Sequence, residues 1–214
     1  MKRLVLIDSH AIIYRAYHAL PPLSSPQGEP MNAVYGFTTL LLRMARELKP
    51  DYIAAAFDLP GITFRHKKSK QYKAHRPPTP ADLASQFHGV EEILAAFEVR
   101  VFKKQGFEAD DIIATLTKKL SKKDLEIIIV TGDMDALQLV SKNVKVYAMR
   151  KGISDMVIYD EAAVHERYGV NAPQMVDLKG LKGDASDNIA GVSGIGEKTA
   201  QELVQKFGTI KGIY

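Results

Sequence analysis

Three short apolar segments, each running into an aspartate, place the strongest constraint on how this chain can fold. They are RLVLID, which ends at Asp8, DYIAAAFD, which ends at Asp58, and LEIIIVTGDMD, which continues into Asp133 and Asp135. Apolar runs of this length between turn signals are typical of buried strands. FEVRVFKK and VKVYAM are two further candidate strands. The sequence therefore predicts a sheet in which several strands end in a carboxylate.

Helical patterns separate these strands, at about 32–48, 81–96, 109–121 and 134–140. Strands that alternate with helices predict an α/β fold with a mostly parallel central sheet flanked by helices. Ligands of such sheets bind beyond the carboxyl ends of the strands. We therefore expect a site at the edge of the sheet where the aspartates lie.

The last quarter of the chain has a different character. From about residue 160 the apolar strands stop, and DEAAVHERYG, APQMVDLKGL and GEKTAQELVQKFG read as helices around the glycine-rich segment KGDASDNIAGVSGIGEKTA. We predict an α/β body over 1–160 and a helical subdomain over 161–214.

Acidic residues also gather outside the strand ends. In GFEADDIIATLTKKL, Glu108, Asp110 and Asp111 precede an apolar helical pattern whose far end carries Lys118, Lys119, Lys122 and Lys123. Acids in a first helical turn stabilise the helix by about 0.3–1 kcal/mol each, so capping is the alternative interpretation for any single one. Nine carboxylates form the full predicted group: Asp8, Asp58, Glu108, Asp110, Asp111, Asp133, Asp135, Asp184 and Asp187.

These nine acids predict a metal centre if they converge. Two carboxylates about 4 Å apart repel by roughly 4 kcal/mol at an effective dielectric constant of about 20, so protons or cations must neutralise such a cluster. The chain has no cysteine, and no histidine stands at a recognisable ligand spacing. An all-oxygen site favours Mg²⁺ or Mn²⁺. The number of acids predicts two ions, which together hold the attacking and leaving oxygens of a phosphoryl displacement.

The rest of the chain is cationic. Net charge is only +4, but 16 acidic residues stand against 29 basic ones once the nine acids are set aside. The densest basic block is TFRHKKSKQYKAHRPPTP, residues 63–80, and its basic and aromatic members are Arg65, Lys67, Lys68, Lys70, Lys73 and Arg76 with Phe64 and Tyr72. Basic side chains interleaved with aromatic rings suit a nucleic-acid backbone and a stacked base. A solvated loop without a partner is the alternative, but the block closely follows Asp58, which favours nucleic acid.

A second candidate contact for nucleic acid is the segment GVSGIGEKTA. Gly191, Gly194 and Gly196 allow tight turns and close backbone approach, and Lys198 and Thr199 fall in the first turn of the following helix. The free N–H groups at a helix start bind phosphate. Contacts of this kind read the backbone rather than the bases, and they weaken steeply with salt.

Composition limits the remaining possibilities. The absence of cysteine excludes disulfides and thiolate metal sites. Neither a signal peptide nor a transmembrane run is recognisable, so we expect a cytoplasmic, nucleoid-associated monomer without a membrane partner.

Four motifs in order carry a resemblance to a known family: LVLIDSH…YRAYHAL, FD…FRH…YKAHRPPTP, FEADDIIATL…VTGDMDALQLV and KGDASDNIAGVSGIGEKTA. From residue 4 to its end, the chain resembles the 5′ nuclease domain that begins bacterial DNA polymerase I, which also occurs as stand-alone 5′–3′ exonucleases. Both belong to the flap-endonuclease class. The resemblance implies a PIN-like fold and a structure-specific 5′ nuclease that cuts DNA flaps, nicks, gaps or RNA–DNA primers in replication and repair.

The resemblance also implies roles for individual residues. The two metal groups of the family map onto the nine acids, and Arg65 and Lys73 match positions that meet the scissile phosphate, with Tyr72 beside them. The residues expected to take part in catalysis are then Asp8, Asp58, Arg65, Lys73 and Asp111. The arch of the family maps onto the basic segment at about 61–90. Its helix–turn–helix variant, which grips the duplex and often holds K⁺, maps onto 185–205 in the C-terminal subdomain. The family domain usually continues for several dozen helical residues, so we expect that this chain is truncated and that a polymerase is fused to it or cooperates with it.

Some positions depart from the family pattern, and other functions stay open. Ser9 stands where the family usually has glycine, and Ala190 and Ser193 replace common prolines. These changes remove no carboxylate, although they put duplex affinity in doubt. The alternatives are a PIN-type single-strand ribonuclease, a branched-DNA clamp without catalysis, and a small-molecule phosphatase with an aspartate nucleophile, which would have no use for the 63–80 block.

Overall fold

The computed structural model describes residues 1–121 and 124–214, so Lys122 and Lys123 lie outside the described part. A six-stranded sheet forms its centre, in the order β3-β2-β1-β4-β5-β6. The first five strands are parallel, and β6 pairs antiparallel with β5. This arrangement confirms the predicted mostly parallel sheet. The strands are β1 (Lys2–Asp8), β2 (Tyr52–Phe57), β3 (Arg100–Lys103), β4 (Leu125–Thr131), β5 (Val144–Lys151) and β6 (Asp155–Tyr159).

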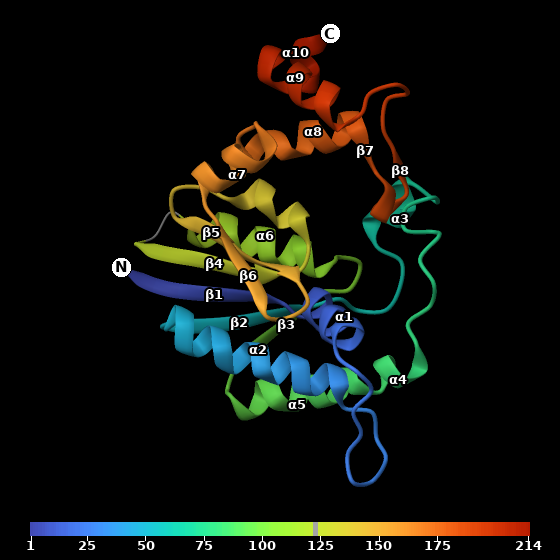
Figure 1. Ribbon diagram of the computed structural model, residues 1–214, viewed down its shortest axis with the longest axis vertical. Coiled ribbons are helices and arrows are strands. Elements are labelled where there is room, and N and C mark those ends of the chain that lie inside the picture. The colour runs from blue at the N-terminus through green and yellow to red at the C-terminus, as the bar shows by residue number, and fades with distance from the viewer. Residues whose placement is uncertain (122–123) are drawn as a thin grey trace.

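Both faces of the sheet are covered, which explains why β1 and β4 are apolar almost throughout. One face packs against α1 (Ser9–Ala19), α2 (Asn32–Leu48), α4 (Ala81–Ala84) and α5 (Gln86–Ala96). The other face packs against α6 (Ala109–Leu120) and the C-terminal helices. Figure 1 shows the two layers on either side of the sheet. Alternate residues of β1, such as Val5 and Leu6, therefore enter different hydrophobic clusters.

Several elements differ from the expectation. Helix α1 was not predicted, although Asp8 caps it, and the edge strand β6 was also missed. The helix expected at 81–96 is divided at Ser85 into α4 and α5. The segment expected as a helix at 134–140 forms the 3₁₀ helix η1 (Met134–Leu139). The helices expected at 32–48 and 109–121 are confirmed as α2 and α6.

The C-terminal part is helical, as expected, and stacks on the sheet at the top of Figure 1. Its side chains share a hydrophobic cluster with the sheet, and the division at residue 160 stays a prediction. No helix in residues 1–121 and 124–214 is both long and apolar enough to cross a membrane. The elements are α7 (Glu161–Tyr168), η2 (Ala172–Gln174), α8 (Met175–Lys182), β7 (Gly183–Asp184), η3 (Ala185–Asp187), β8 (Ile189–Ala190), α9 (Glu197–Phe207) and α10 (Ile210–Ile213).

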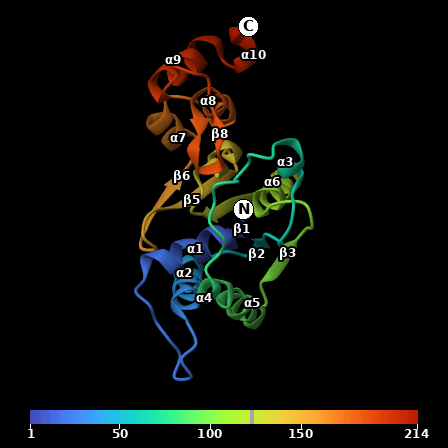
Figure 2. The same ribbon diagram turned by 90° about the vertical axis from the view of Figure 1, so that its right-hand side faces the viewer.

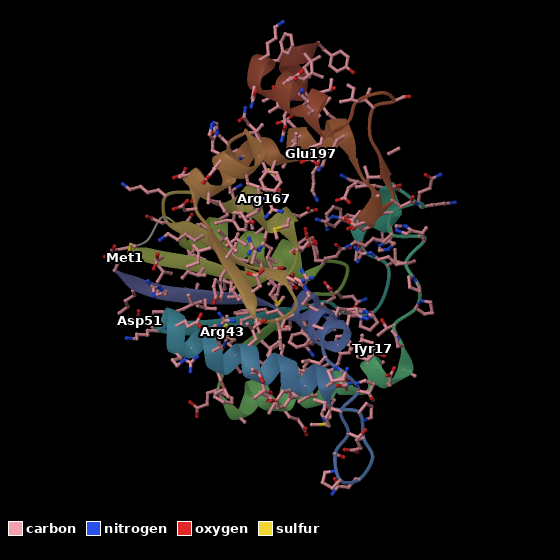
Figure 3. All side chains as sticks on the ribbon, viewed as in Figure 1. Met1, Tyr17, Arg43, Asp51, Arg167 and Glu197 are labelled. Carbon is pink, nitrogen blue, oxygen red and sulfur yellow. The ribbon has the colours of Figure 1, made fainter. Side chains whose placement is uncertain are left out.

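The direction of the strands decides where a site can form. Met1 and Asp51 lie at the end of the sheet where β1 and β2 begin (Figure 3). The carboxyl ends of these strands lie on the opposite side. There the basic segment 63–80 runs from the short helix α3 (Phe64–Lys68) down to α4 as an extended strap, as Figure 2 shows. The strap contacts the small β7–β8 hairpin, because the Lys73 N–H donates to the carbonyl of Asp187 at 3.0 Å.

Candidate active site

Asp8 stands at the end of the central strand β1 and is only 5% exposed. One carboxylate oxygen accepts the N–H of Ala11 at 3.2 Å and so caps α1. The other accepts the hydroxyl of Thr131, at the end of the adjacent strand β4, at 2.6 Å. Capping and placement in a site are therefore compatible, because each oxygen has its own partner.

Asp58 follows the neighbouring strand β2. One of its oxygens accepts the N–H of Ala109, the first residue of α6, at 2.5 Å. Its own N–H donates to His10 Nδ1 at 3.2 Å, and the His10 ring packs against Phe57 and Phe87. The two strand ends and the start of α6 are thereby held together.

Five of the nine predicted acids line one cavity of about 510 Å³ at this edge of the sheet. Its wall also includes Lys73, Arg76 and the α1 residues His10, Tyr14 and His18. The acids come from four separate regions of the chain: the end of β1, the end of β2, the start of α6 and the turn after β4. The five acids are Asp8, Asp58, Glu108, Asp110 and Asp133.

Three carboxyl groups of this cavity, those of Asp8, Asp110 and Asp133, have pKa values above their usual range. Burial raises the pKa of Asp8 to about 6, despite the opposing hydrogen bond from Thr131, and nearby Asp58 adds to the rise. Burial also raises the pKa of Asp110 well above its usual range, and Asp8 and Asp133 raise it further by repulsion. Burial raises the pKa of Asp133 as well. Such groups are stabilised as carboxylates when cations neutralise them.

A second acidic group lies beside the first. Asp135, Asp184 and Asp187 each offer one oxygen, and these three atoms lie within 4.8 Å of one another. Asp184 caps η3, accepting hydrogen bonds from the N–H of Ser186 at 2.9 Å and from its hydroxyl at 2.6 Å. All the donors in both groups are carboxylate oxygens. This donor set and spacing fit a hard divalent cation, with no place for a soft, thiolate-bound metal.

Asp111 lines a smaller cavity of about 190 Å³ with Glu108, Asp110, Asp135 and Asp187, and its expected place at the metal centre stays a prediction. Its carboxylate receives two hydrogen bonds from Arg65, at 2.7 and 2.8 Å, and a third from the N–H of Glu108 at 2.9 Å. Although burial opposes it, Arg65 lowers the pKa of Asp111 below its usual range. Asp111 thus completes the capping box at the start of α6, which is the interpretation that the sequence left open as the alternative.

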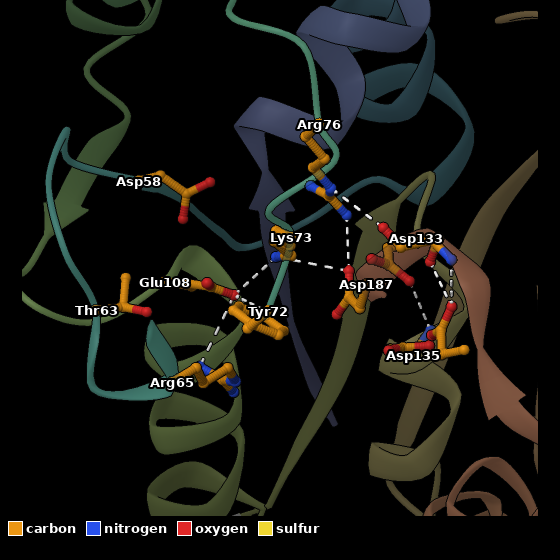
Figure 4. Close-up of polar contacts among 12 residues, drawn as sticks. Asp58, Thr63, Arg65, Tyr72, Lys73, Arg76, Glu108, Asp133, Asp135 and Asp187 are labelled. Carbon is orange, nitrogen blue, oxygen red and sulfur yellow. Dashed lines mark hydrogen bonds and ion pairs between the residues drawn. The ribbon is translucent and has the colours of Figure 1, made fainter. Parts of the chain in front are cut away.

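Glu108 and Lys73 connect the acids to the basic strap. Glu108 is only 8% exposed and accepts hydrogen bonds from the Tyr72 hydroxyl and from Lys73 Nζ, both at 3.0 Å (Figure 4). Lys73 Nζ also lies 3.9 Å from Asp187, so this ammonium spans the two acidic groups. Arg76 pairs with Asp187 at 2.8 Å.

The remaining strap residues divide between surface and interior. Lys67, Lys68 and Lys70 are exposed, as a backbone-contacting role requires. Tyr72, in contrast, is only 6% exposed and packs edge-on against His66. The stacking role expected for Tyr72 does not fit this placement, because its ring is covered and its hydroxyl is held by Glu108.

The glycine-rich segment forms a tight connection between β8 and α9. A Cβ at Gly191 would lie 2.3 Å from the carbonyl carbon of Lys182, so this approach requires glycine. Gly194 has φ +80°, and Gly196 directly precedes α9. Lys198 and Thr199 are exposed in the first turn of that helix, where a phosphate could reach them.

The sequence interpretation missed three side chains of the site. Thr131 and His10 hold Asp8 and Asp58, and Lys179 of α8 pairs with Asp184 at 2.8 Å and also with Asp135. The signal for Lys179 was its place one helical turn before the Gly-Asp pair in KGLKGD. A lysine in a helical pattern is read as a solvated residue when the turn that follows it is unknown.

Comparisons with known proteins agree with this geometry. The family described as "5'-3' exonuclease, N-terminal resolvase-like domain" matches residues 3–169, and that described as "5'-3' exonuclease, C-terminal SAM fold" matches residues 170–214. DNA polymerase I of Bacillus caldotenax is 45% identical over 212 residues, which cover 99% of this chain and 24% of the relative. DNA polymerase I of Bacillus subtilis (strain 168) is 43% identical over 210 residues, covering 98% of this chain and 24% of that protein. The chain thus spans about a quarter of the length of these curated relatives.

Solved structures share the fold. A bacteriophage T5 protein crystallised with metal ions has a TM-score of 0.80 and 21% identity, covering 99% of this chain and 78% of that one. The T5 flap endonuclease in a complex with DNA and metal ions has a TM-score of 0.79 and 22% identity, with the same coverage. These likenesses extend over the sheet and the C-terminal helices together.

Proposed function

Because the chain belongs to the 5′-3′ exonuclease family, we propose that it hydrolyses phosphodiester bonds of DNA as a divalent-metal-dependent 5′ nuclease. The observation that carries this proposal is the cavity in which five carboxylates from distant segments meet beside Lys73 and Arg76. A cavity lined by both carboxylates and cationic side chains suits a phosphate held between metal ions and those cations.

Two ions fit the acidic groups, and we propose Mg²⁺ or Mn²⁺ because every donor is a carboxylate oxygen. Asp8, Asp58, Glu108, Asp110 and Asp133 would hold the first, and Asp135, Asp184 and Asp187 the second. Divalent ions supply such a site with charge neutralisation of the phosphate and with water of lowered pKa. Asp133 is assigned to the first ion because it lines the cavity with Asp8.

The basic strap would orient the substrate over the acids. Lys73 Nζ, 3.0 Å from Glu108 and 3.9 Å from Asp187, lies where it can meet the charge that develops on a reacting phosphate. Arg65 is held in place by Asp111 and lies 3.8 Å from Glu108. It would therefore bind the same DNA strand as Lys73. A preorganised donor of this kind needs no rearrangement when the reaction occurs.

We infer the substrate class from the family and from the placement of the exposed cations. The lysines of the strap and the start of α9 would contact phosphates on two sides of the cavity, as a branched or nicked duplex requires. DNA flaps, nicks and RNA–DNA primers are then the substrates, and K⁺ at the glycine-rich turn would assist the duplex contact. Since the relatives are bacterial DNA polymerases, we propose that a polymerase is fused to this chain or cooperates with it in the cytoplasm.

Cleavage of a 5′-flap DNA labelled at its 5′ end, with Mg²⁺ and with EDTA, tests the proposal. We expect cleavage near the junction with Mg²⁺ and none with EDTA. Asp110→Asn should lower the rate by about a hundredfold or more, because the cavity loses a carboxylate. Asp155→Asn, in the β5–β6 hairpin where Asp155 pairs with Arg150, is the matched control and should cleave at the wild-type rate.

The same assay separates the alternative functions. Binding of the flap without cleavage under any metal condition would indicate a DNA clamp. Cleavage of single-stranded RNA with no requirement for a duplex would indicate a PIN-type ribonuclease. Either result would refute the proposed function.

A further inference from the structure

A lysine lies inside the second acidic group. The Nζ of Lys179 is 2.8 Å from a carboxylate oxygen of Asp184 and also contacts a carboxylate oxygen of Asp135. These are two of the three residues whose oxygens lie within 4.8 Å of one another. The side chain of Lys179 is 27% exposed, so its ammonium is partly withdrawn from water. A cation of the protein itself therefore already stands among the oxygens that would bind a metal ion.

The end of α8 builds this contact. The N–H of Gly183 donates to the carbonyl of Lys179, and Gly183 then takes φ +80°, which turns the chain back toward the helix. Asp184 consequently faces the preceding helical turn, where Lys179 lies. A Cβ at Gly183 would come 2.4 Å from the backbone nitrogen of Gly191, so the β8 strand also fixes this turn. The placement of Lys179 follows from backbone geometry rather than from a freely rotating surface side chain.

We propose that Lys179 is a built-in counter-cation of the second acidic group, and that a divalent ion must displace its ammonium to bind there. The inference rests on the proposed function, because it assumes that the group binds a metal ion. A metal ion about 2 Å from an oxygen that an ammonium contacts at about 3 Å would lie close to that ammonium, and the two cations would repel strongly.

An open groove next to Lys179 can accept its side chain after displacement. Lys179 also lines an open groove of about 520 Å³, together with Arg76, Asp133 and Ser186. This groove adjoins the cavity, because both are lined by Ala11, Tyr14, His18, Arg76 and Asp133. A lysine swung into it would lie beside the path of the substrate. Ion binding at the second group would thus be weaker than at the first and would release a cation toward the substrate.

The two acidic groups differ in how many of their carboxylates pair with a lysine or arginine of the protein. In the described residues, Lys179 forms ion pairs with two of the three acids of the second group. In the first group, only Glu108 has lysine or arginine partners within 4.0 Å, and Asp8, Asp110 and Asp133 have none among the described residues. At the first group an ion would meet a lysine or arginine of the described residues only at Glu108, and both of those contacts are to the same oxygen, Oε2. The ion pairs of the described residues therefore leave the other carboxylates of this group open to an ion.

Binding of Mn²⁺ to the full chain without DNA, measured by isothermal titration calorimetry and by electron paramagnetic resonance, tests the inference. We expect a tighter and a weaker class of site in the wild type. Lys179→Met should tighten the weaker class by about fivefold or more, which is the lower range of coupling between two binding events. Lys179→Arg keeps the charge and should stay within about twofold of the wild type.

Lys182→Met is the matched control. Lys182 also lies on α8, about one helical turn after Lys179. It pairs with Glu197 at 3.0 Å, outside the acidic group. Its removal should leave both classes unchanged. Thermal unfolding of each variant checks that the fold is retained, and Lys179→Gln provides a second neutral variant if Lys179→Met unfolds.

Two negative results can be told apart. If both classes bind Mn²⁺ but Lys179→Met leaves the weaker class unchanged or weakens it, the lysine does not compete with the ion, and the proposed nuclease function still stands. If the wild type and all variants bind no Mn²⁺, both the metal-dependent function and the inference about Lys179 are refuted. The variant Asp8→Asn assigns the two classes of site, because it should abolish the tighter class. In a double variant with Asp8→Asn, Lys179→Met should still tighten the weaker class.

Discussion

Arg65 and Asp111 form a two-pronged ion pair, with Nη1–Oδ2 at 2.7 Å and Nη2–Oδ1 at 2.8 Å. The pair joins the basic strap to the first turn of α6, directly beside Glu108. Planar pairs of this kind fix the direction of a guanidinium as well as its position. Asp111 thus acts on the site through Arg65, although it does not line the cavity with Asp8.

The first prediction follows from this pair. Asp111→Asn should lower the cleavage rate by about tenfold, since the amide keeps one hydrogen bond to Arg65 but loses the charge that holds both. Asp110→Asn should cause a loss of about a hundredfold or more, because Asp110 lines the cavity itself. Single-turnover rates on flap DNA compare the two. Equal losses in both variants would mean that Asp111 reaches the metal ions directly.

A pH dependence follows from the raised pKa of Asp8, which burial moves to about 6 from an ordinary value of 3.8. A carboxyl with a raised pKa in the folded state binds its proton more tightly there, so its stabilising contribution is present below pH 4. That contribution disappears as the pH rises from about 4 to about 6. The size of the loss is on the order of 3 kcal/mol for this residue, at about 1.4 kcal/mol per pKa unit.

Thermal unfolding between pH 4 and pH 7 measures this effect. In EDTA the midpoint should fall across this range more steeply for the wild type than for Asp8→Asn, which has no proton to lose. With Mg²⁺ the fall should largely vanish, because a bound ion neutralises the carboxylate. An identical slope in Asp8→Asn and in the wild type would contradict the assignment of the pH effect to Asp8.

The sequence predicted the sheet and the gathering of acids for one physical reason. Parallel strands bring their carboxyl ends to one edge, so Asp8 and Asp58 had to be neighbours once β1 and β2 were recognised. The choice between capping and metal binding had no such signal. Asp8 caps α1 and also lines the cavity, whereas Asp111 caps α6 and is turned toward Arg65. Only the fold decides which oxygen remains available.

The contacts between the strap and the β7–β8 hairpin could not be predicted from the sequence either. Asn188 donates to the carbonyl of Gln71 at 2.8 Å, and Arg76 pairs with Asp187, across more than 100 residues of chain. Neither contact has a local pattern, because both depend on the left-handed turn at Asn188 and on the path of an irregular loop. The burial of Tyr72 has the same origin, since Glu108 and His66 come together only through these turns.

A third prediction concerns the glycine-rich turn. Gly191→Ala should destabilise the protein by about 3 kcal/mol, because the added Cβ would overlap the backbone of Lys182 and Gly183. Gly194→Ala should cost only about 1 kcal/mol, since its φ of +80° is unfavourable for alanine but the space around it is open. Urea unfolding measures both. A smaller loss for Gly191→Ala than for Gly194→Ala would contradict the packing of β8 against the end of α8.

The last prediction separates the surface lysines of the strap from Lys73. Lys67, Lys68 and Lys70 are exposed and, within the described residues, form no ion pair with an acid. Replacing all three with alanine should weaken binding to flap DNA and reduce the salt slope of log Kd by up to about 0.9 per lost phosphate contact. The rate of cleavage at saturating DNA should change little, because none of these side chains lines the acidic cavity.

Lys73→Met should show the reverse pattern. Its ammonium lies between Glu108 and Asp187, so its loss removes a charge at the reacting phosphate and lowers the cleavage rate by about a hundredfold. The salt dependence of log Kd should change by at most the amount expected for the loss of one phosphate contact. Binding isotherms at four salt concentrations and single-turnover rates distinguish the two variants. If the triple variant lost its rate while Lys73→Met kept it, the strap would hold the strand over the acids through its outer lysines and not through Lys73.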